Sequence, residues 1–218
     1  MTRVLLLSTV HEEQGLATTP ALHAILERFR PDVIFLEIPP AAFPAYSDGT
    51  RSNLESSAAT RYRETNDVVL VPVDLPTPED SFFRDWQYLD RRITATSPTY
   101  RQLIDRNTLD IATYGFPYLN SEQSSKAWSE IYEAMEVAIQ RLSHDTRLPA
   151  IYEAWRRTNE RRDRAMLKNI YDYCHLNPFE NGVLLVGAAH TQSIISISRE
   201  GRPAGAPRIE CGDLHRPP

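Results

Sequence analysis

Three continuous apolar segments constrain the fold most strongly, because each reads as a β-strand buried on both faces. They are RVLLLST at Arg3–Thr9, DVIFLEI at Asp32–Ile38 and GVLLVGA at Gly182–Ala188. A fourth segment, DVVLVPVD at Asp67–Asp74, is similar, but Pro72 favours an edge position or an early end because proline cannot donate to a strand ladder. Such strands are typical of a parallel sheet that helices cover on both sides.

Helices are expected between these strands. Between the first two, Thr18 or Thr19 can cap a helix that begins near Pro20 and stops at Pro31, which gives a right-handed strand–helix–strand unit. The chain is polar over residues 40–66, where a loop or short helices are expected. It then becomes helical from about residue 78 to 176, with two long amphipathic segments.

These patterns predict one α/β domain over residues 1–218. It has a mostly parallel central sheet, flanking helices and a helical insertion at about 78–176, before the last core strand. A short further strand is expected around Arg208–Cys211.

Composition and charge exclude several classes of function. A net charge of -5 with scattered basic residues argues against a nucleic-acid partner. No apolar segment approaches the roughly 20 residues that span a bilayer, and the first apolar run is too short for a secretion signal. The two cysteines, Cys174 and Cys211, form no CxxC pair. We therefore expect a cytoplasmic protein without membrane contact.

Each core strand ends in a side chain that can bind a metal or move a proton. His11 follows the first strand, Glu37 closes the second, Asp74 follows the third and His190 follows the last. In a parallel sheet these positions share one edge, where ligands usually bind. Two histidines and a carboxylate suit zinc, manganese, cobalt or iron, so His11, Glu37 and His190 are candidate metal ligands. Asp74, which precedes Leu75-Pro76, is expected to be a turn residue.

Short motifs in these segments resemble the TraB/TIKI family, which belongs with ChaN-like haem-uptake proteins and erythromycin esterases. The matching segments are STVH from Ser8, PDVIFLEI with its glutamate Glu37, and VLLVGAAH ending at His190. The helical segment RDRAM fits the family's Arg-Asp element through Arg162 and Asp163. The resemblance implies the same α/β fold, with two Gly-x-x-His motifs, one near each end of the domain.

The chain departs from the family pattern at two positions. Ser8 replaces the glycine of the first motif, so a glycine-only backbone conformation there would be unfavourable. Arg161 stands where the family often has a glutamate, and Glu160 lies one residue earlier, about 100 degrees away around a helix.

The chemistry that the resemblance implies is hydrolysis of an amide or ester in a peptide or small-molecule substrate. In a TIKI-like, metal-dependent version, His11, His190 and Glu37 hold the cation. The general base is Glu12 or Glu13, or Glu37 if it is not a ligand. Arg162 stabilises the oxyanion, and Asp163 holds Arg162 or a histidine in place. In a metal-free version resembling erythromycin esterases, His11 is the base, Glu37 orients it and His190 lies on the opposite face.

Two alternatives remain open. Arg162 and Asp163 could belong to an ordinary charged helix face. The domain could also be a binding or regulatory module that ligates haem, as ChaN-like members do, or one that has lost catalysis through Ser8. The aromatic residues of the long helices are candidates for a homodimer surface or a substrate lid; they are Trp128, Tyr132, Trp155, Tyr171 and Tyr173.

Overall fold

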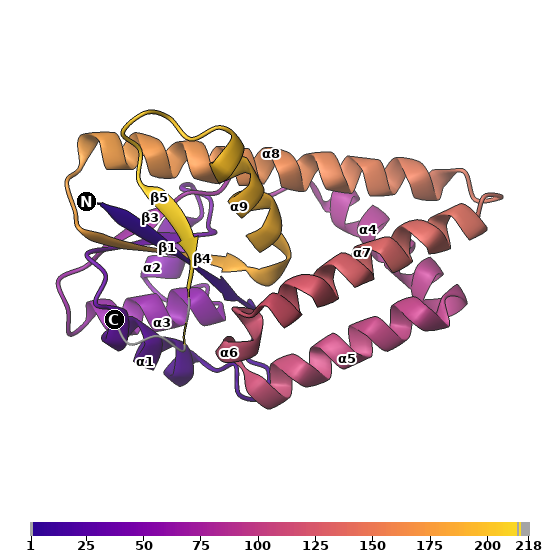
Figure 1. Ribbon diagram of the computed structural model, residues 1–218, viewed down its shortest axis with the longest axis horizontal. Helices are drawn as coiled ribbons and strands as arrows, with labels where there is room; N and C mark the ends of the chain where they lie inside the picture. Colours follow the sequence, from indigo (N-terminus) through magenta and orange to yellow (C-terminus); the bar gives the residue numbers. More distant parts are fainter. Residues whose placement is uncertain (1, 213, 215–218) are drawn as a thin grey trace.

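The computed structural model describes residues 2–212 and 214, and its centre is a parallel sheet (Figure 1). Within this part of the chain the sheet has five strands in the order β3-β2-β4-β1-β5, and every pair is parallel. The strands are β1 (Arg3–Thr9), β2 (Val33–Leu36), β3 (Val69–Pro72), β4 (Asn181–Gly187) and β5 (Arg208–Cys211).

The helices fall into three groups along the chain. Those between the first three strands are α1 (Thr19–Phe29), α2 (Phe43–Ser47) and α3 (Leu54–Arg63). The helices of the insertion are α4 (Asp80–Thr96), α5 (Pro98–Tyr114), α6 (Phe116–Leu119), α7 (Glu122–Arg141) and α8 (Arg147–Leu176). A short 3-10 turn at Ala188–His190 and α9 (Thr191–Glu200) follow β4.

The predicted fold class is confirmed, down to the place of the helical insertion before the last core strand. The strand that ends at Pro72 lies at the edge of the sheet, as a proline in a strand requires. The second strand is shorter than expected and spans Val33–Leu36; just before it, the side chain of Asp32 accepts hydrogen bonds from the backbone N–H groups of Glu180 and Asn181. None of the described helices is both long and apolar enough to cross a membrane.

The sheet is covered on both faces, which explains its continuous apolar strands. On one face Leu7, Ile34 and Leu185 pack with residues of α1 and α3. On the other face Leu6 and Leu184 pack with residues of α8 and α9. Alternate residues of each strand therefore serve opposite cores.

The insertion has a core of its own, which extends away from the sheet (Figure 1). Leu89 and Ile93 of α4 pack there with Ile131 and Met135 of α7. Helix α8 belongs to both cores: its first turns enter the insertion, and its later residues cover the sheet. With 30 residues, α8 is about 45 Å long.

Candidate functional site

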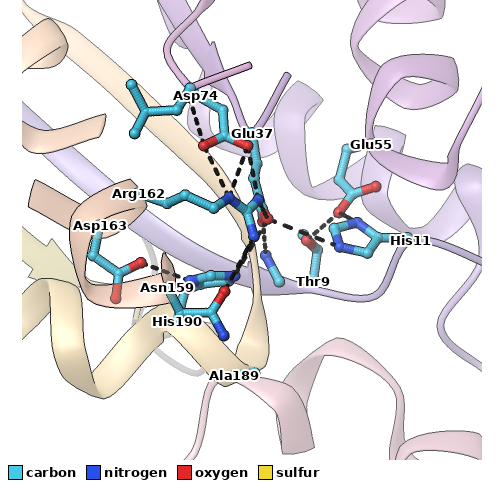
Figure 2. Close-up of polar contacts among 12 residues, drawn as sticks. Thr9, His11, Glu37, Glu55, Asp74, Asn159, Arg162, Asp163, Ala189 and His190 are labelled. Carbon is cyan, nitrogen blue, oxygen red and sulfur yellow. Dashed lines mark hydrogen bonds and ion pairs between the residues drawn. The ribbon is translucent and has the colours of Figure 1, made fainter. Parts of the chain in front are cut away.

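The carboxyl ends of four strands meet at one edge of the sheet. Thr9 of β1 is in register with Gly187 of β4. Leu36 of β2 pairs with Leu185 of β4 on one side and with Pro72 of β3 on the other. Since the strands are parallel, the residues that follow them emerge at the same edge; they are His11, Glu37, Asp74 and His190 (Figure 2).

Glu37 lies at the centre of this edge, and only 4% of its side chain is exposed. Its Oε1 accepts a hydrogen bond from Arg162 at 2.6 Å, and its Oε2 accepts one from the backbone N–H of Gly187 at 2.8 Å. The Nε2 atoms of His190 and His11 lie 3.3 and 4.0 Å from Oε1. Burial alone would raise the pKa of Glu37, but these cations, His190 foremost, lower it well below its usual range. Glu37 is therefore a fixed anion and a weak base.

Arg162 of α8 joins two of the strand ends. Its Nη2 donates to Glu37 at 2.6 Å and to Asp74 Oδ2 at 2.7 Å, and its Nε donates to Asp74 Oδ1 at 3.1 Å. Its Nη1 lies 3.5 Å from His190 Nε2. Burial opposes the charge, but the bonds with Asp74 and Glu37 outweigh it and raise the pKa of Arg162. The guanidinium is thus a permanent cation in a fixed orientation.

His190 is paired with the neighbour of Arg162 on α8. Its Nδ1 lies 2.6 Å from Oδ1 of Asp163, a carboxylate that is 2% exposed. Burial would lower the pKa of His190, but the charge of Glu37 and the hydrogen bond with Asp163 raise it to about 10. His190 is therefore an imidazolium at neutral pH, and its Nε2 faces Glu37.

His11 has a similar partner but an open position. Its Nδ1 lies 2.9 Å from Oε1 of Glu55, a buried residue of α3 that also accepts a hydrogen bond from Thr9 at 2.7 Å. The backbone N–H of Leu54, at the start of α3, donates to the carbonyl of His11 at 2.9 Å, which fixes the helix against the strand end. The hydrogen bond with Glu55 raises the pKa of His11 to about 9. Its side chain remains 53% exposed.

The structure brings together five of the six predicted catalytic residues: His11, Glu37, Arg162, Asp163 and His190 (Figure 2). Arg162 and Asp163 point inward, so the reading of this helix face as ordinary surface charge is wrong.

Glu12, predicted as a general base, does not join them. It is exposed, follows His11 in a bend and makes no described contact with the other five residues. Glu13, the other candidate, accepts a hydrogen bond from the backbone N–H of Thr19 at the start of α1. The carboxylate beside His11 is Glu55 instead.

Sequence reasoning missed Glu55 and underrated Asp74. Glu55 lies in the polar segment 40–66, yet it shares a helix face with Ala59 and Tyr62, four and seven residues later, and all three are buried. That spacing is the signal that could have identified it. Asp74 does bond the N–H of Leu75, as a turn residue would, but it is also the main partner of Arg162.

The two departures from the family pattern have simple structural consequences. Ser8 lies in β1 with a negative φ, since Arg30, at the end of α1, is the one described non-glycine residue with a positive φ; the serine therefore causes no backbone strain. Its hydroxyl pairs with that of Thr191 at 2.7 Å. Glu160 forms an ion pair with Arg164 at 2.8 Å, and no described contact joins it to His11, Glu37 or His190.

Whether His11, Glu37 and His190 could hold the implied metal depends on the groups that already contact them. Arg162 occupies Oε1 of Glu37 and also lies beside His190 Nε2, so a metal ion there would meet a guanidinium charge. In the described part of the chain, no group of three or more His, Cys, Asp or Glu side chains is arranged to hold a metal ion. The residues in this conformation therefore do not fit the predicted His11, Glu37 and His190 metal site.

Comparisons with known proteins do not identify a family: no family model, curated protein or solved structure matches the chain. The class of site is therefore defined by its own geometry. Two histidine–carboxylate pairs flank a buried glutamate and a partly buried arginine at the carboxyl edge of a parallel sheet.

Proposed function

We propose that this protein hydrolyses an ester or amide, with His11 as the base that activates water and with no metal in the reaction. The observation that carries the proposal is the His11–Glu55 pair. Its buried carboxylate holds Nδ1, while the half-exposed ring turns Nε2 toward Glu37 at 4.0 Å. A histidine oriented in this way by a carboxylate is a common general base in acyl transfer.

The reactive form of His11 is the neutral imidazole. Glu55 selects the tautomer with the proton on Nδ1, so the lone pair of Nε2 is free to take a proton from water. The resulting hydroxide attacks the carbonyl carbon and forms a tetrahedral intermediate. The imidazolium of His11 then gives this proton to the leaving alcohol or amine as the bond to carbon breaks. The products are a carboxylic acid and that alcohol or amine.

Arg162 and His190 supply positive charge for the oxyanion. Both are cations at neutral pH, and Arg162 Nη1 lies 3.5 Å from His190 Nε2. Their carboxylate partners, Asp74 and Asp163, hold them in place before the reaction, which is the condition for electrostatic catalysis. Glu37 balances this charge and is too weak a base to replace His11.

A metal-dependent hydrolase is the second candidate. The observation in its favour is that each histidine has its Nδ1 on a carboxylate, a pattern typical of metal-ligating histidines. It would require Arg162 to release Glu37. The haem-binding alternative rests on the family resemblance alone.

The test is hydrolysis of a panel of chromogenic aryl esters and anilides by the purified protein and its His11→Ala variant. We expect turnover in the wild type and a loss of about 10²- to 10⁴-fold in His11→Ala. His144→Ala, at an exposed histidine beyond α7, is the matched control and should keep full activity. Equal rates in wild type and His11→Ala would refute the role of His11.

A further inference from the structure

A cavity of about 780 Å³ lies between the insertion and the Arg162–His190 side of the proposed catalytic site. Arg162, Asp163, Ala189 and His190 line it where it meets the sheet, and helices α4, α5, α7 and α8 supply the other walls. Its volume is that of a site for a drug-sized ligand and far exceeds the needs of an acetyl group. The cavity therefore has room for a large substrate group beside the site.

One wall of this cavity is a continuous aromatic surface. The rings of Trp86 and Trp155 stack with centroids 4.6 Å apart and an interplanar angle of 18°. Tyr152 continues the stack at 6.1 Å and 11°, and Tyr132 lies 5.7 Å from Trp155. Because Trp86, Trp155 and Tyr152 stack on one another, they offer a ligand their ring edges and the outer faces of the stack, and Tyr132 is tilted by 51° to Trp155. Such a column favours a flat aromatic ligand that extends the stack or packs against its edges.

The end of the cavity remote from the sheet is acidic. Asp90 lies one turn beyond Trp86 on α4, and Glu136 lies one turn beyond Tyr132 on α7. Arg156 lies 3.9 Å from Glu136, but among the described residues no basic side chain forms an ion pair with Asp90, whose Oδ1 accepts a hydrogen bond from a tyrosine hydroxyl. A cationic group at this end would meet an uncompensated carboxylate.

The distance along α8 between the acidic end and the catalytic edge indicates how long such a ligand must be. Tyr152, which donates to Glu136 at 3.1 Å, precedes Asp163 by eleven residues on α8. At 1.5 Å per residue the acidic end is about 16 Å from the catalytic edge. A ligand that spans the cavity is thus elongated.

We propose that this cavity binds an elongated, flat aromatic group of the substrate, with a basic nitrogen at the end remote from the scissile bond. The position of the scissile bond rests on the proposed hydrolytic function. The binding of the aromatic amine rests on the cavity alone, so the two can be tested separately.

The chain offers an internal reporter, because all three of its tryptophans, Trp86, Trp128 and Trp155, line the cavity. Energy transfer from tryptophan to a dansyl group therefore reports binding to the protein, and variants of the lining residues then test whether the cavity is the site. The three probes share the dansyl ring and differ in charge: dansylcadaverine is cationic, dansylamide neutral and dansylglycine anionic. We expect dansylcadaverine to bind most tightly and dansylglycine most weakly.

Three variants locate the binding, with the affinity measured from directly excited dansyl emission. Trp155→Ala should weaken all three probes by about tenfold or more, because it removes the centre of the aromatic wall. Asp90→Asn keeps a hydrogen-bond acceptor for Tyr100 and should abolish the preference for dansylcadaverine. Leu109→Ala, at an apolar α5 residue that is 65% exposed and outside the cavity lining, is the matched control and should change nothing.

The proposal is overturned if no probe binds, if Trp155→Ala binds as the wild type does, or if dansylglycine binds most tightly. If Trp155→Ala does not fold, Trp86→Phe and Asp90→Asn decide instead, because both changes are conservative. The same titration in His11→Ala separates the two proposals. Intact binding without wild-type ester hydrolysis supports the cavity and contradicts the proposed function, whereas hydrolysis without probe binding does the reverse.

Discussion

His11 and His190 have the same kind of surroundings but different exposure. Each ring has Nδ1 on a buried carboxylate and Nε2 toward Glu37, yet the side chain of His11 is 53% exposed and that of His190 only 10%. An exposed imidazole can exchange its proton with water or substrate, whereas a buried imidazolium between two carboxylates keeps its charge. Both histidines have a carboxylate partner, so burial, more than the identity of that partner, makes His190 a fixed cation and leaves His11 able to act as a base.

The largest expected difference between the two histidines is in the free energy of unfolding of their alanine variants. His190→Ala leaves Asp163 buried without its partner, so we expect a loss of about 3–5 kcal/mol in the free energy of unfolding. His11→Ala also removes the partner of a buried carboxylate, Glu55, but the half-exposed ring leaves a space that water can enter, so we expect a smaller loss of about 1–3 kcal/mol. Urea denaturation at pH 7 measures both, beside His144→Ala. Equal losses at the two histidines would contradict this role of burial.

The second prediction concerns the pH profile of hydrolysis. Because the base must be neutral, the rate should rise with pH along a limb centred near 9, the pKa of His11. Glu55→Gln removes the charge that raises this pKa, so the limb should move toward about 6.5. The plateau should also fall by about tenfold to a hundredfold, because Glu55 no longer fixes the tautomer.

Glu12→Gln is the matched control for that profile. It changes a neighbouring carboxylate of the same charge that is exposed and makes no described contact with the site. In this variant the rise of the hydrolysis rate with pH should still be centred near 9. A shift of the limb in Glu12→Gln, but not in Glu55→Gln, would restore Glu12 as the partner of His11.

The third prediction is the pH dependence of stability. The pKa values of His11 and His190 are raised in the folded protein, to about 9 and about 10, from about 6.5 in the unfolded chain. Their contribution is therefore complete below pH 6.5 and is lost as the pH rises to 10. The pKa of Glu37 is lowered, so its contribution is present above about 4.5 and is lost in acid.

Denaturation between pH 4 and 10 should thus place maximal stability between about pH 5 and 6.5. Asp163→Asn should flatten the alkaline decline, since it removes one of the groups that raise the pKa of His190. An unchanged decline in this variant would mean that other groups titrate there.

The smallest expected effect is that of metal removal. Because Arg162 occupies the glutamate that a metal would need, chelation should leave activity unchanged, and elemental analysis should find equal, substoichiometric metal in wild type and in a His11→Ala/His190→Ala variant. One equivalent of manganese, cobalt, zinc or iron that is lost in the variant would instead favour the metal-dependent candidate. A Soret band in the wild type would favour haem.

The sequence predicts the sheet and its reactive edge because both depend on local patterns. Continuous apolar runs define buried strands, and parallel pairing then brings His11, Glu37 and His190 together. Which carboxylate meets which histidine depends on tertiary contacts: a local pattern can mark Glu55 as part of a buried helix face, but it does not show that this face meets His11. Glu55 lies 44 residues from His11, in a segment too polar to predict as a helix that packs on the sheet.

The aromatic residues of the insertion show the same limit. Trp128, Tyr132 and Trp155 line the cavity, while Tyr171 and Tyr173 pack against the sheet core instead. From sequence, a substrate lid and a dimer surface were equally consistent with them. In the structure the first three rings lie on α7 and the first half of α8, in the insertion, whereas the last two lie on the end of α8 that covers the sheet.

The strand order also constrains how the chain acquires its shape. Both neighbours of β1 come from far along the chain, since Arg3 pairs with Asn181 on one side and with Arg208 on the other. Contacts of such high sequence separation form late and slowly. During synthesis β1 therefore emerges long before its partners and exposes two unpaired edges, which are open to aggregation. His11 and His190 meet only when β4 has docked, so no partly folded intermediate that lacks β4 can have the complete site.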